Sequence, residues 1–170
     1  MIVKTIKEWT TLKGHKALAV INETGRINGY VGVPETSILF GMDYCTVENT
    51  PKIEHLNEEG LRYYKAIEGV NEISVHGGLT YADKGSNDFL KSGFWFFGFD
   101  TRHYEDLPSQ ETAFKYFTKI TEQMVVSNYF KNCQDLEVGE GTYKTLEFVI
   151  EHCESLSEQL KEIENSCSKE

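Results

Sequence analysis

The run Phe94–Phe99, which reads FWFFGF, constrains the fold more than any other part of the sequence. It is apolar at all six positions, so it predicts a short central strand that is covered on both faces. Two further strands are predicted at 16–22 and 27–33, joined by a turn at 23–26 in which Gly25 is free to take a positive φ. A fourth, at 72–76, alternates apolar and polar residues before two glycines.

The last third of the sequence has the periodicity of helices. Ser109 is a favourable N-cap, and the apolar residues of Ala113–Val125 mark one face of a helix expected to reach about Phe130. A final helix is expected from about Thr142 to Asn165, and a weaker one over 53–68.

These elements predict an α+β fold, a small, mainly antiparallel sheet packed against two or three helices. The length of 170 residues is that of one domain, so we expect a single domain over 1–170 with a frayed tail at about 165–170. Hydrophobic residues make up 39% and charged residues 26%, a globular mixture. No apolar run approaches the ~20 residues of a membrane span, and no signal peptide is evident, so a cytoplasmic protein is expected.

Four scattered cysteines, without a C-x-x-C pair, give no sign of a zinc site. The net charge of −10 argues against binding long nucleic acid, which needs a basic surface. The charge is uneven, however: residues 146–170 hold seven Glu against two Lys, whereas 76–104 hold three Asp against three basic residues. A small anionic ligand is therefore best tolerated within 76–104.

The final helix has apolar residues at alternating steps of three and four, a seam of about two and a half heptads. The seam fits a helix packed on the sheet, and it also fits pairing with a second subunit. We expect a homo-oligomer, a dimer or tetramer, on the second interpretation. The seam consists of Leu146, Val149, Cys153, Leu156, Leu160 and Ile163.

Function is expected to lie between His76 and Asp106. A strand that ends in Gly77-Gly78 can turn backbone N–H groups toward one point, and such nests bind phosphate oxygens. Thr80 and Tyr81 would add hydroxyl groups. The competing interpretation of this stretch is a β-bulge beside a half-buried histidine.

The loop after the aromatic strand repeats a polar residue every third position, at Asp100, His103 and Asp106. With His76, these side chains can act as acid and base or as metal ligands. They can also recognise a ligand, with Arg102 on a phosphate and Tyr or Trp stacked on a base. A third interpretation is a set of surface charges with one hydrogen-bonded histidine.

No phosphate-binding loop, H-E-x-x-H or G-x-S-x-G motif is present, and no nucleophile is evident. The two glycines of 29–34 have the wrong spacing for a dinucleotide fingerprint and indicate a close approach by another backbone or a ligand. We therefore expect a binding protein without cofactor or metal more than an enzyme.

Four motifs occur in a familiar order: GYVGVP at 29–34, VHGGLTY at 75–81, WFFGFDTRH at 95–103 and TLEFVIEHCESLSEQL at 145–160. Together they resemble a widespread family of small phage proteins, over roughly residues 14–161. The resemblance extends to the phage anti-CBASS sponge proteins, which sequester the cyclic nucleotide signals of bacterial immunity without degrading them and assemble as oligomers.

The resemblance implies an immune-evasion protein of the host cytoplasm that binds cyclic oligonucleotides, such as cyclic dinucleotides. Two departures affect the ligand: 35–39 reads ETSIL where the family has a Gly-His-Pro-like stretch, and Arg102 and Tyr104 flank His103 where the family has small residues. The expected ligand-binding residues are His76, Gly77, Gly78, Thr80, Tyr81, Trp95, Asp100, Arg102, His103, Tyr104 and Tyr44.

Two alternatives stay open. One is a metal-assisted nucleotide hydrolase or phosphodiesterase whose catalytic residues are His76, Asp100, His103 and Asp106. The other is an inhibitor that binds a host protein through its acidic helical face.

Overall fold

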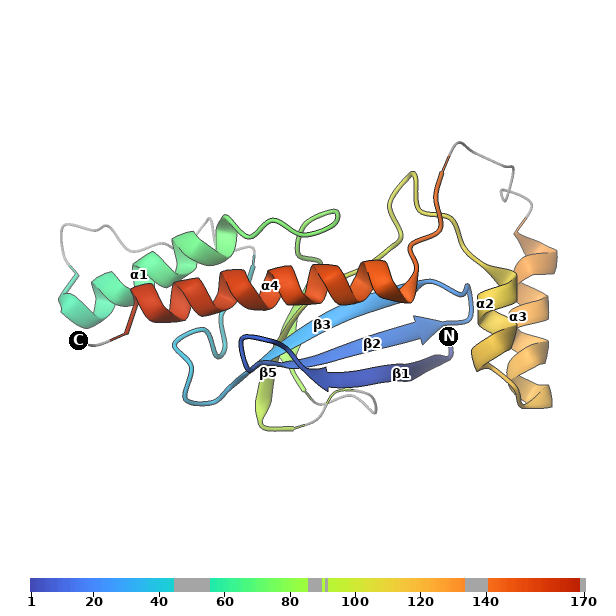
Figure 1. Ribbon diagram of the computed structural model, residues 1–170, viewed down its shortest axis with the longest axis horizontal. Helices are drawn as coiled ribbons and strands as arrows, with labels where there is room; N and C mark the ends of the chain where they lie inside the picture. The colour runs from blue at the N-terminus through green and yellow to red at the C-terminus, as the bar shows by residue number, and fades with distance from the viewer. Residues whose placement is uncertain (45–55, 86–89, 91, 134–140, 169–170) are drawn as a thin grey trace.

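The computed structural model describes residues 1–44, 56–85, 90, 92–133 and 141–168. Within these residues it has a five-stranded antiparallel sheet and four helices, which confirms the predicted α+β fold (Figure 1). The strands are β1 (Val3–Thr10), β2 (Lys16–Asn22), β3 (Ile27–Pro34), β4 (Tyr81–Lys84) and β5 (Phe94–Phe99). The helices are α1 (Glu58–Asn71), α2 (Gln110–Tyr116), α3 (Ile120–Asn132) and α4 (Leu146–Ser166).

The strand order is β1-β2-β3-β5-β4, so β5 lies between β3 and the short edge strand β4. Its neighbouring residues Phe96 and Phe97 point to opposite faces, and both are 0% exposed, as predicted for a strand covered on both sides. The strands β1 and β4 were not predicted, because they carry charged side chains and occupy the two edges, where one side of the ladder is open.

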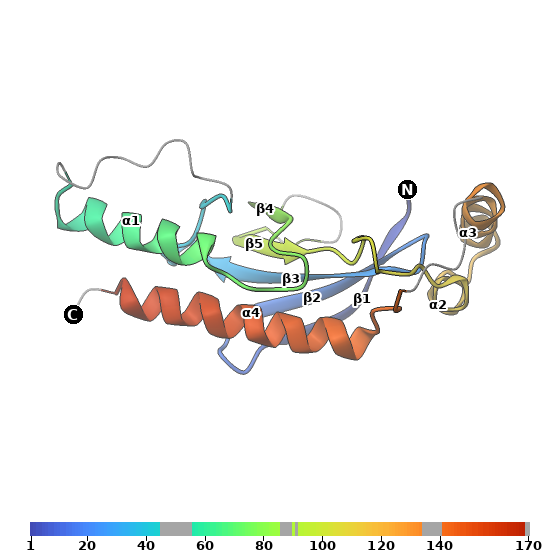
Figure 2. The ribbon, with the colours of Figure 1, turned by 90° about the horizontal axis from the view of Figure 1, so that it is seen from above.

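The helix α4 lies along one face of the sheet, across β3 and β2 (Figures 1 and 2). Its heptad seam is buried against this chain's own sheet and α1, in agreement with the first interpretation of the seam. Helix α1 runs beside the C-terminal half of α4 in the opposite direction (Figure 1). Gly69 has no side chain, which lets α1 approach Ile163 of α4 closely. The opposite face of the sheet carries a smaller cluster of Leu18, Val20, Tyr30, Leu90 and Phe96.

The α4–β3 contact is close because Gly29 has no side chain. A Cβ at Gly29 would lie 2.5 Å from the Phe99 ring and 2.7 Å from Sγ of Cys153 on α4. The ring and the sulfur thus fill the space above β3, so at Gly29 the close approach comes from side chains and not from the backbone or ligand that the sequence predicted.

The single helix predicted from Ser109 to about Phe130 is two helices, which corrects that prediction. Ser109 does cap α2, since its Oγ accepts the N–H of Thr112. The chain leaves the helix at Phe117, whose ring is 1% exposed, and α3 begins after Lys119. The expected apolar face is therefore interrupted: Ile120 and Met124 are 78% and 66% exposed.

The helix ends follow their capping groups. Asn57 caps α1, which therefore starts at Glu58, and positions 53–55 of the predicted helix lie outside the described residues. Thr145 caps α4 through the N–H of Phe148. The helix runs to Ser166 and Cys167 is 3% exposed, so the expected frayed tail does not begin at 165; residues 169–170 lie outside the described part.

No helix in the described ranges is long and apolar enough to cross a bilayer. From the sequence, residues 132–142 with Gly139 and Gly141 are expected to connect the last two helices, and most of this stretch, 134–140, lies outside the described residues.

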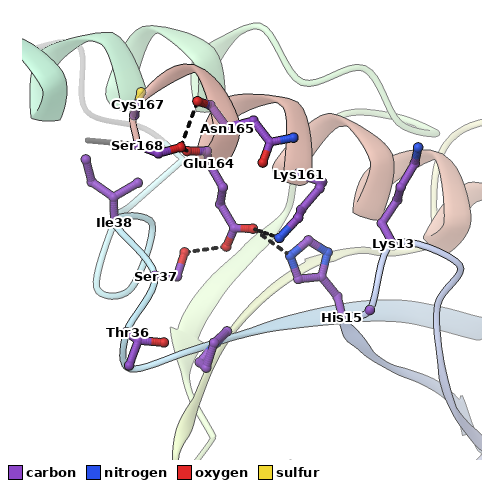
Figure 3. Close-up of a pocket in the computed structure, with 12 residues that line it drawn as sticks. Lys13, His15, Thr36, Ser37, Ile38, Lys161, Glu164, Asn165, Cys167 and Ser168 are labelled. Atoms are coloured by element: carbon purple, nitrogen blue, oxygen red, sulfur yellow. Dashed lines mark hydrogen bonds and ion pairs between the residues drawn. The ribbon is translucent and has the colours of Figure 1, made fainter. Parts of the chain in front are cut away.

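A buried polar clamp fixes the C-terminal half of α4 to the sheet (Figure 3). His15 is 5% exposed, and its Nδ1 lies 2.8 Å from Oγ of Ser157 while its Nε2 lies 3.1 Å from Oε2 of Glu164. Ser37 donates to the other carboxylate oxygen of Glu164 at 2.5 Å, and Lys161 adds a charge at 3.4 Å. Burial alone would raise the pKa of Glu164, but the bonds from His15 and Ser37 and the nearby charges lower it to about 2.

We predict that Glu164→Gln lowers the free energy of unfolding by about 2 kcal/mol at pH 7, less than the ~3 kcal/mol that the whole pKa shift represents. Because the folded-state pKa is depressed, this stabilisation is present above about pH 4.5 and is lost as the pH falls through about 2. Urea unfolding at pH 7 and at pH 3 measures both effects.

Glu158→Gln is the matched control, since Glu158 pairs with Lys13 on the surface and its side chain is 57% exposed. Its expected effect is below about 0.5 kcal/mol. Equal losses in the two variants would contradict the clamp.

Candidate functional site

The turn at 76–78 and the loop at 100–106 meet above the N-terminal half of α4. The strand β5 ends at Phe99, and the next N–H, that of Asp100, donates to Oγ1 of Thr80. The N–H of Thr80 donates back to the carbonyl of Gly98. Two segments twenty residues apart in the sequence are thereby held side by side at one end of the sheet.

The segment before the turn is not the strand predicted at 72–76, and its hydrogen bonds explain why. The N–H and C=O of Ser74 bond to the side-chain amide of Gln159, and the N–H of His76 donates to Nδ1 of His152. Both partners are side chains of α4, so this backbone is satisfied by a helix and has no need of a neighbouring strand.

Gly77 brings the turn into contact with the loop. Its φ is +67°, and a Cβ on it would lie 1.8 Å from Nε2 of His103. No side chain fits there, so the imidazole of His103 packs directly on the turn backbone. Gly78 also has a positive φ, +84°, but nothing lies within 4 Å of a Cβ at that position.

Asp106 is the buried centre of the site, with 4% of its surface exposed. Its carboxylate lies 2.8 Å and 3.0 Å from Nε2 of His76 and accepts the N–H of His103 at 2.9 Å. Burial alone would raise the pKa of Asp106, but these hydrogen bonds and the charge of Lys144 outweigh burial and lower it. The carboxylate is therefore charged at neutral pH.

Lys144 reaches the same carboxylate through a tertiary contact that joins the loop to the start of α4. The N–H of Leu107 donates to the carbonyl of Thr142, and the N–H of Thr142 donates to the carbonyl of Glu105. This bridge places Nζ of Lys144 3.5 Å from Oδ1 of Asp106. The ammonium group also lies 5.5 Å from the ring centre of Phe148.

His152 and Phe148 form the floor of the site. The His76 ring packs edge-on against His103 and Phe148, with centroids 5.1 Å away in each case, and lies 5.9 Å from His152. Burial, and then the nearby His76, lower the pKa of His152, which keeps it neutral and able to accept from His76. Three of the four histidines in the described ranges therefore converge.

Sequence reasoning missed Lys144, Phe148 and His152. They lie on or just before a helix that the sequence predicts well. The sequence pattern does not indicate, however, which turn of that helix lies next to the end of β5, so these residues could not be assigned to the site. The single available signal is the polar position of His152 next to the buried Cys153.

The structure brings together several of the predicted residues. Asp100 lies 3.6 Å from Nε2 of His103, and the hydroxyl of Tyr44 donates to the carbonyl of Thr80, beside Asp100. With Gly77, the grouped set is His76, Thr80, Asp100, His103, Asp106 and Tyr44.

Other predicted residues lie elsewhere. Tyr81 packs edge-on against Tyr30 on the face opposite α4, and Trp95 donates to the carbonyl of Met42 and packs against Phe40. Arg102 and Tyr104 are exposed, Tyr104 fully. The stacking residues named from the sequence therefore do not converge on one surface.

The turn also has fewer free donors than the sequence suggested. The N–H of Gly78 donates to the carbonyl of Val75, and those of His76 and Thr80 are used as described above. Recognition of an anion here would fall to side chains, since the N–H groups of His76, Gly78 and Thr80 are already satisfied within the chain.

The arrangement can hold a cation or exchange a proton. One atom each from His76, His103 and Asp106 lies within 4.8 Å of the others. The imidazoles are partly accessible, with 20% and 33% of their side chains exposed, so a ligand can reach them.

A separate cavity of about 410 Å³ lies at the other end of α4, beside the His15–Glu164 clamp (Figure 3). Lys13 and Lys161 line it together with Thr36 and Asn165. Its buried polar groups already bond to one another, and no predicted site residue lines it. The two-loop site at the N-terminal half of α4 is therefore the stronger candidate.

No protein-family model, no curated protein and no solved structure matches this chain. The resemblance to a phage family rests on its four motifs alone and stays a prediction.

We predict that Asp106→Asn lowers the free energy of unfolding by about 1–3 kcal/mol at pH 7, because a buried carboxylate that accepts two hydrogen bonds and faces an ammonium is replaced by a neutral amide. Chemical denaturation monitored by tryptophan fluorescence measures the loss.

Asp100→Asn is the comparison, since the Asp100 side chain is 37% exposed and, among the described residues, accepts the N–H of Arg102 and lies 3.6 Å from the His103 imidazole. We expect a change below about 1 kcal/mol. An equal or larger loss in this variant would show that Asp106 is not the centre of the site.

Proposed function

We propose that this chain binds a small phosphate-bearing ligand of the cyclic oligonucleotide class at the surface between the 76–78 turn and the 100–106 loop, and holds it without turnover. The protein would then act as a sponge for host immune signals, as the four-motif resemblance implies. The observation that carries the proposal is the gathering of His76, His103 and Lys144 at one partly exposed surface of a chain whose net charge is −10.

Charge supports an anionic ligand at this place. Lys144 lies beside Asp106, and Arg102 is an exposed residue of the 100–106 loop, so two permanent cations belong to the segments that form the site. Phosphate oxygens accept strong, charge-assisted hydrogen bonds from such groups. The remainder of α4 is acidic and would repel the same ligand, which favours binding at this end of the helix.

Aromatic groups support a ligand that carries bases. The ring of Tyr104 is fully exposed one residue after His103, and Tyr44 is held near Thr80 by a hydrogen bond of 3.2 Å. A base that stacks on an exposed ring gains roughly 1–3 kcal/mol without any sequence-specific readout. Trp95 and Tyr81, which contact other parts of the fold, are not included in this proposal.

The proposed oligomer would need a surface other than the heptad seam, since the seam packs within the chain. A pocket shared between subunits would suit a ligand with two-fold symmetry.

The test is a panel of cyclic di- and trinucleotides titrated by calorimetry, followed by heat denaturation of each complex and chromatography of the released ligand. We expect one or more members to bind and to be released intact. A cleaved product would instead support the hydrolase alternative, with His76, Asp100, His103 and Asp106 acting on the ligand. Binding of no member would refute the proposal and favour a protein partner.

Paired variants locate the binding surface. Lys144→Ala and Arg102→Ala are each expected to weaken binding about tenfold or more, because each removes a charge-assisted contact. Lys13→Ala, at the turn between β1 and β2, removes the same charge elsewhere and is expected to change the affinity less than about twofold.

A further inference from the structure

We propose that the imidazoles of His76 and His103 and the carboxylate of Asp106 form a binding site for one late first-row divalent metal ion, with Zn²⁺ as the ion that fits best. The inference rests on this cluster and does not depend on the nucleotide ligand proposed above.

The geometry is close to that of a bound site. One ligand atom from each residue lies within 4.8 Å of the other two. In a tetrahedral zinc site with bonds of about 2.1 Å, ligand atoms lie about 3.4 Å apart. No pair of ligand atoms therefore needs to approach by more than about 1.4 Å, which rotation of the partly exposed His103 side chain can provide.

The donor set selects the ion. Two imidazole nitrogens and one carboxylate oxygen suit Zn²⁺, Co²⁺ and Ni²⁺, whereas Mg²⁺ and Ca²⁺ favour sites made of oxygen alone. Three protein ligands also leave the fourth coordination position open to water or to a phosphate oxygen, as in catalytic zinc sites.

One ring nitrogen of the cluster lacks a partner. Nε2 of His103 is buried and makes no hydrogen bond with any described residue; its nearest charged neighbour is Oδ1 of Asp100, at 3.6 Å. Buried polar atoms are nearly always paired in folded proteins. A bound ion would supply an imidazole of this cluster with the partner that the described residues do not provide.

The surroundings orient the proposed ligands. Asp106 accepts the N–H of His103, and His152 accepts the N–H of His76, so the backbone of both histidines is fixed. Phe148 packs edge-on against the His76 ring at 5.1 Å. Such outer contacts hold imidazoles in a binding orientation before the ion arrives.

One group opposes the ion. Nζ of Lys144 lies 3.5 Å from Oδ1 of Asp106, and its positive charge competes for the same carboxylate. Lys144 also donates to Thr142 and lies over the Phe148 ring, and it can retain these two contacts when an ion takes its place beside Asp106. Removal of this charge should therefore tighten metal binding, an effect that a purely structural role of Lys144 would not produce.

The experiment titrates the 170-residue chain, stripped of metal with a chelator, with Zn²⁺ against a chromophoric competitor. Co²⁺ is the spectroscopic probe. We expect one equivalent bound with a dissociation constant of about 1 µM or tighter. The visible Co²⁺ spectrum should be that of nitrogen and oxygen ligands, without the thiolate charge-transfer band that binding to Cys133 or another cysteine would give.

Two glycine variants form the matched pair. Gly77→Ala and Gly78→Ala both place a side chain at a positive φ, but only the Cβ at Gly77 collides with His103. We expect Gly77→Ala to weaken Zn²⁺ binding at least about tenfold, with Gly78→Ala within about threefold of the wild type.

His103→Asn decides the question if Gly77→Ala fails to fold, because a side chain that is 33% exposed can be replaced with little structural effect. It should lose at least about tenfold in affinity, and Lys144→Gln should gain about threefold or more. The proposal is overturned if one equivalent of Zn²⁺ does not bind with a dissociation constant of about 100 µM or tighter, which is about 100-fold weaker than expected. It is also overturned if the two glycine variants lose equal affinity and His103→Asn loses none. The metal titration contains no nucleotide, so its outcome is independent of the outcome of the nucleotide panel.

Discussion

The close contact of α4 with β3 at Gly29 is the packing constraint on which the remaining structure depends. Phe99 and Cys153 occupy the space that any side chain at position 29 would fill, so the helix axis is held near the sheet and at a fixed rotation. A buried contact of this kind tolerates little change in volume. Because the contact fixes the helix, it also helps to place Lys144, just before the first turn of α4, beside Asp106, and Glu164, in the last turns, beside His15.

Two polar assemblies then sit at opposite ends of the same helix. At the C-terminal half, His15, Ser157 and Glu164 satisfy one another and fix the helix to the first hairpin. At the N-terminal half, His76 and His103 share Asp106, and one imidazole nitrogen has no hydrogen-bond partner among the described residues. In the first assembly the polar groups bond to one another, whereas in the second an imidazole nitrogen has no partner among the described residues and the imidazoles are partly exposed. The second assembly is therefore the better candidate for binding a ligand.

Much of the fold was accessible from the sequence because local patterns determined it. The apolar run of β5, the hairpin of β2 and β3 and the long amphipathic α4 each appeared at nearly their predicted bounds. The errors arose where tertiary contacts decided the outcome. Residues 74–76 alternate like a strand, but side chains of α4 take their hydrogen bonds, and Phe117 leaves a helical run because its ring enters the core.

The candidate site shows the same division. The spacing of Asp100, His103 and Asp106 was visible in the sequence, and so was the His76–Gly77 turn, because each lies within one short segment. The sequence did not indicate that Asp106 is buried while Asp100 is exposed, or that Lys144 lies beside Asp106. Both follow from the bridge between Thr142 and the loop, which is a tertiary contact. The stacking aromatics were named by residue type alone, and residue type does not indicate which face of the sheet a ring occupies.

The two edges of the sheet have a consequence for how the protein behaves in a crowded solution. An edge strand presents unpaired N–H and C=O groups that can recruit a strand from another molecule. Here β4 is only four residues long and ends in the exposed pair Asp83 and Lys84, while β1 carries Lys7 and Glu8 and has a bulge between Thr5 and Lys7. Short length, charge and irregular register each disfavour strand addition, so the protein is guarded against β-aggregation even though its central strand is among the most apolar segments a sheet can contain.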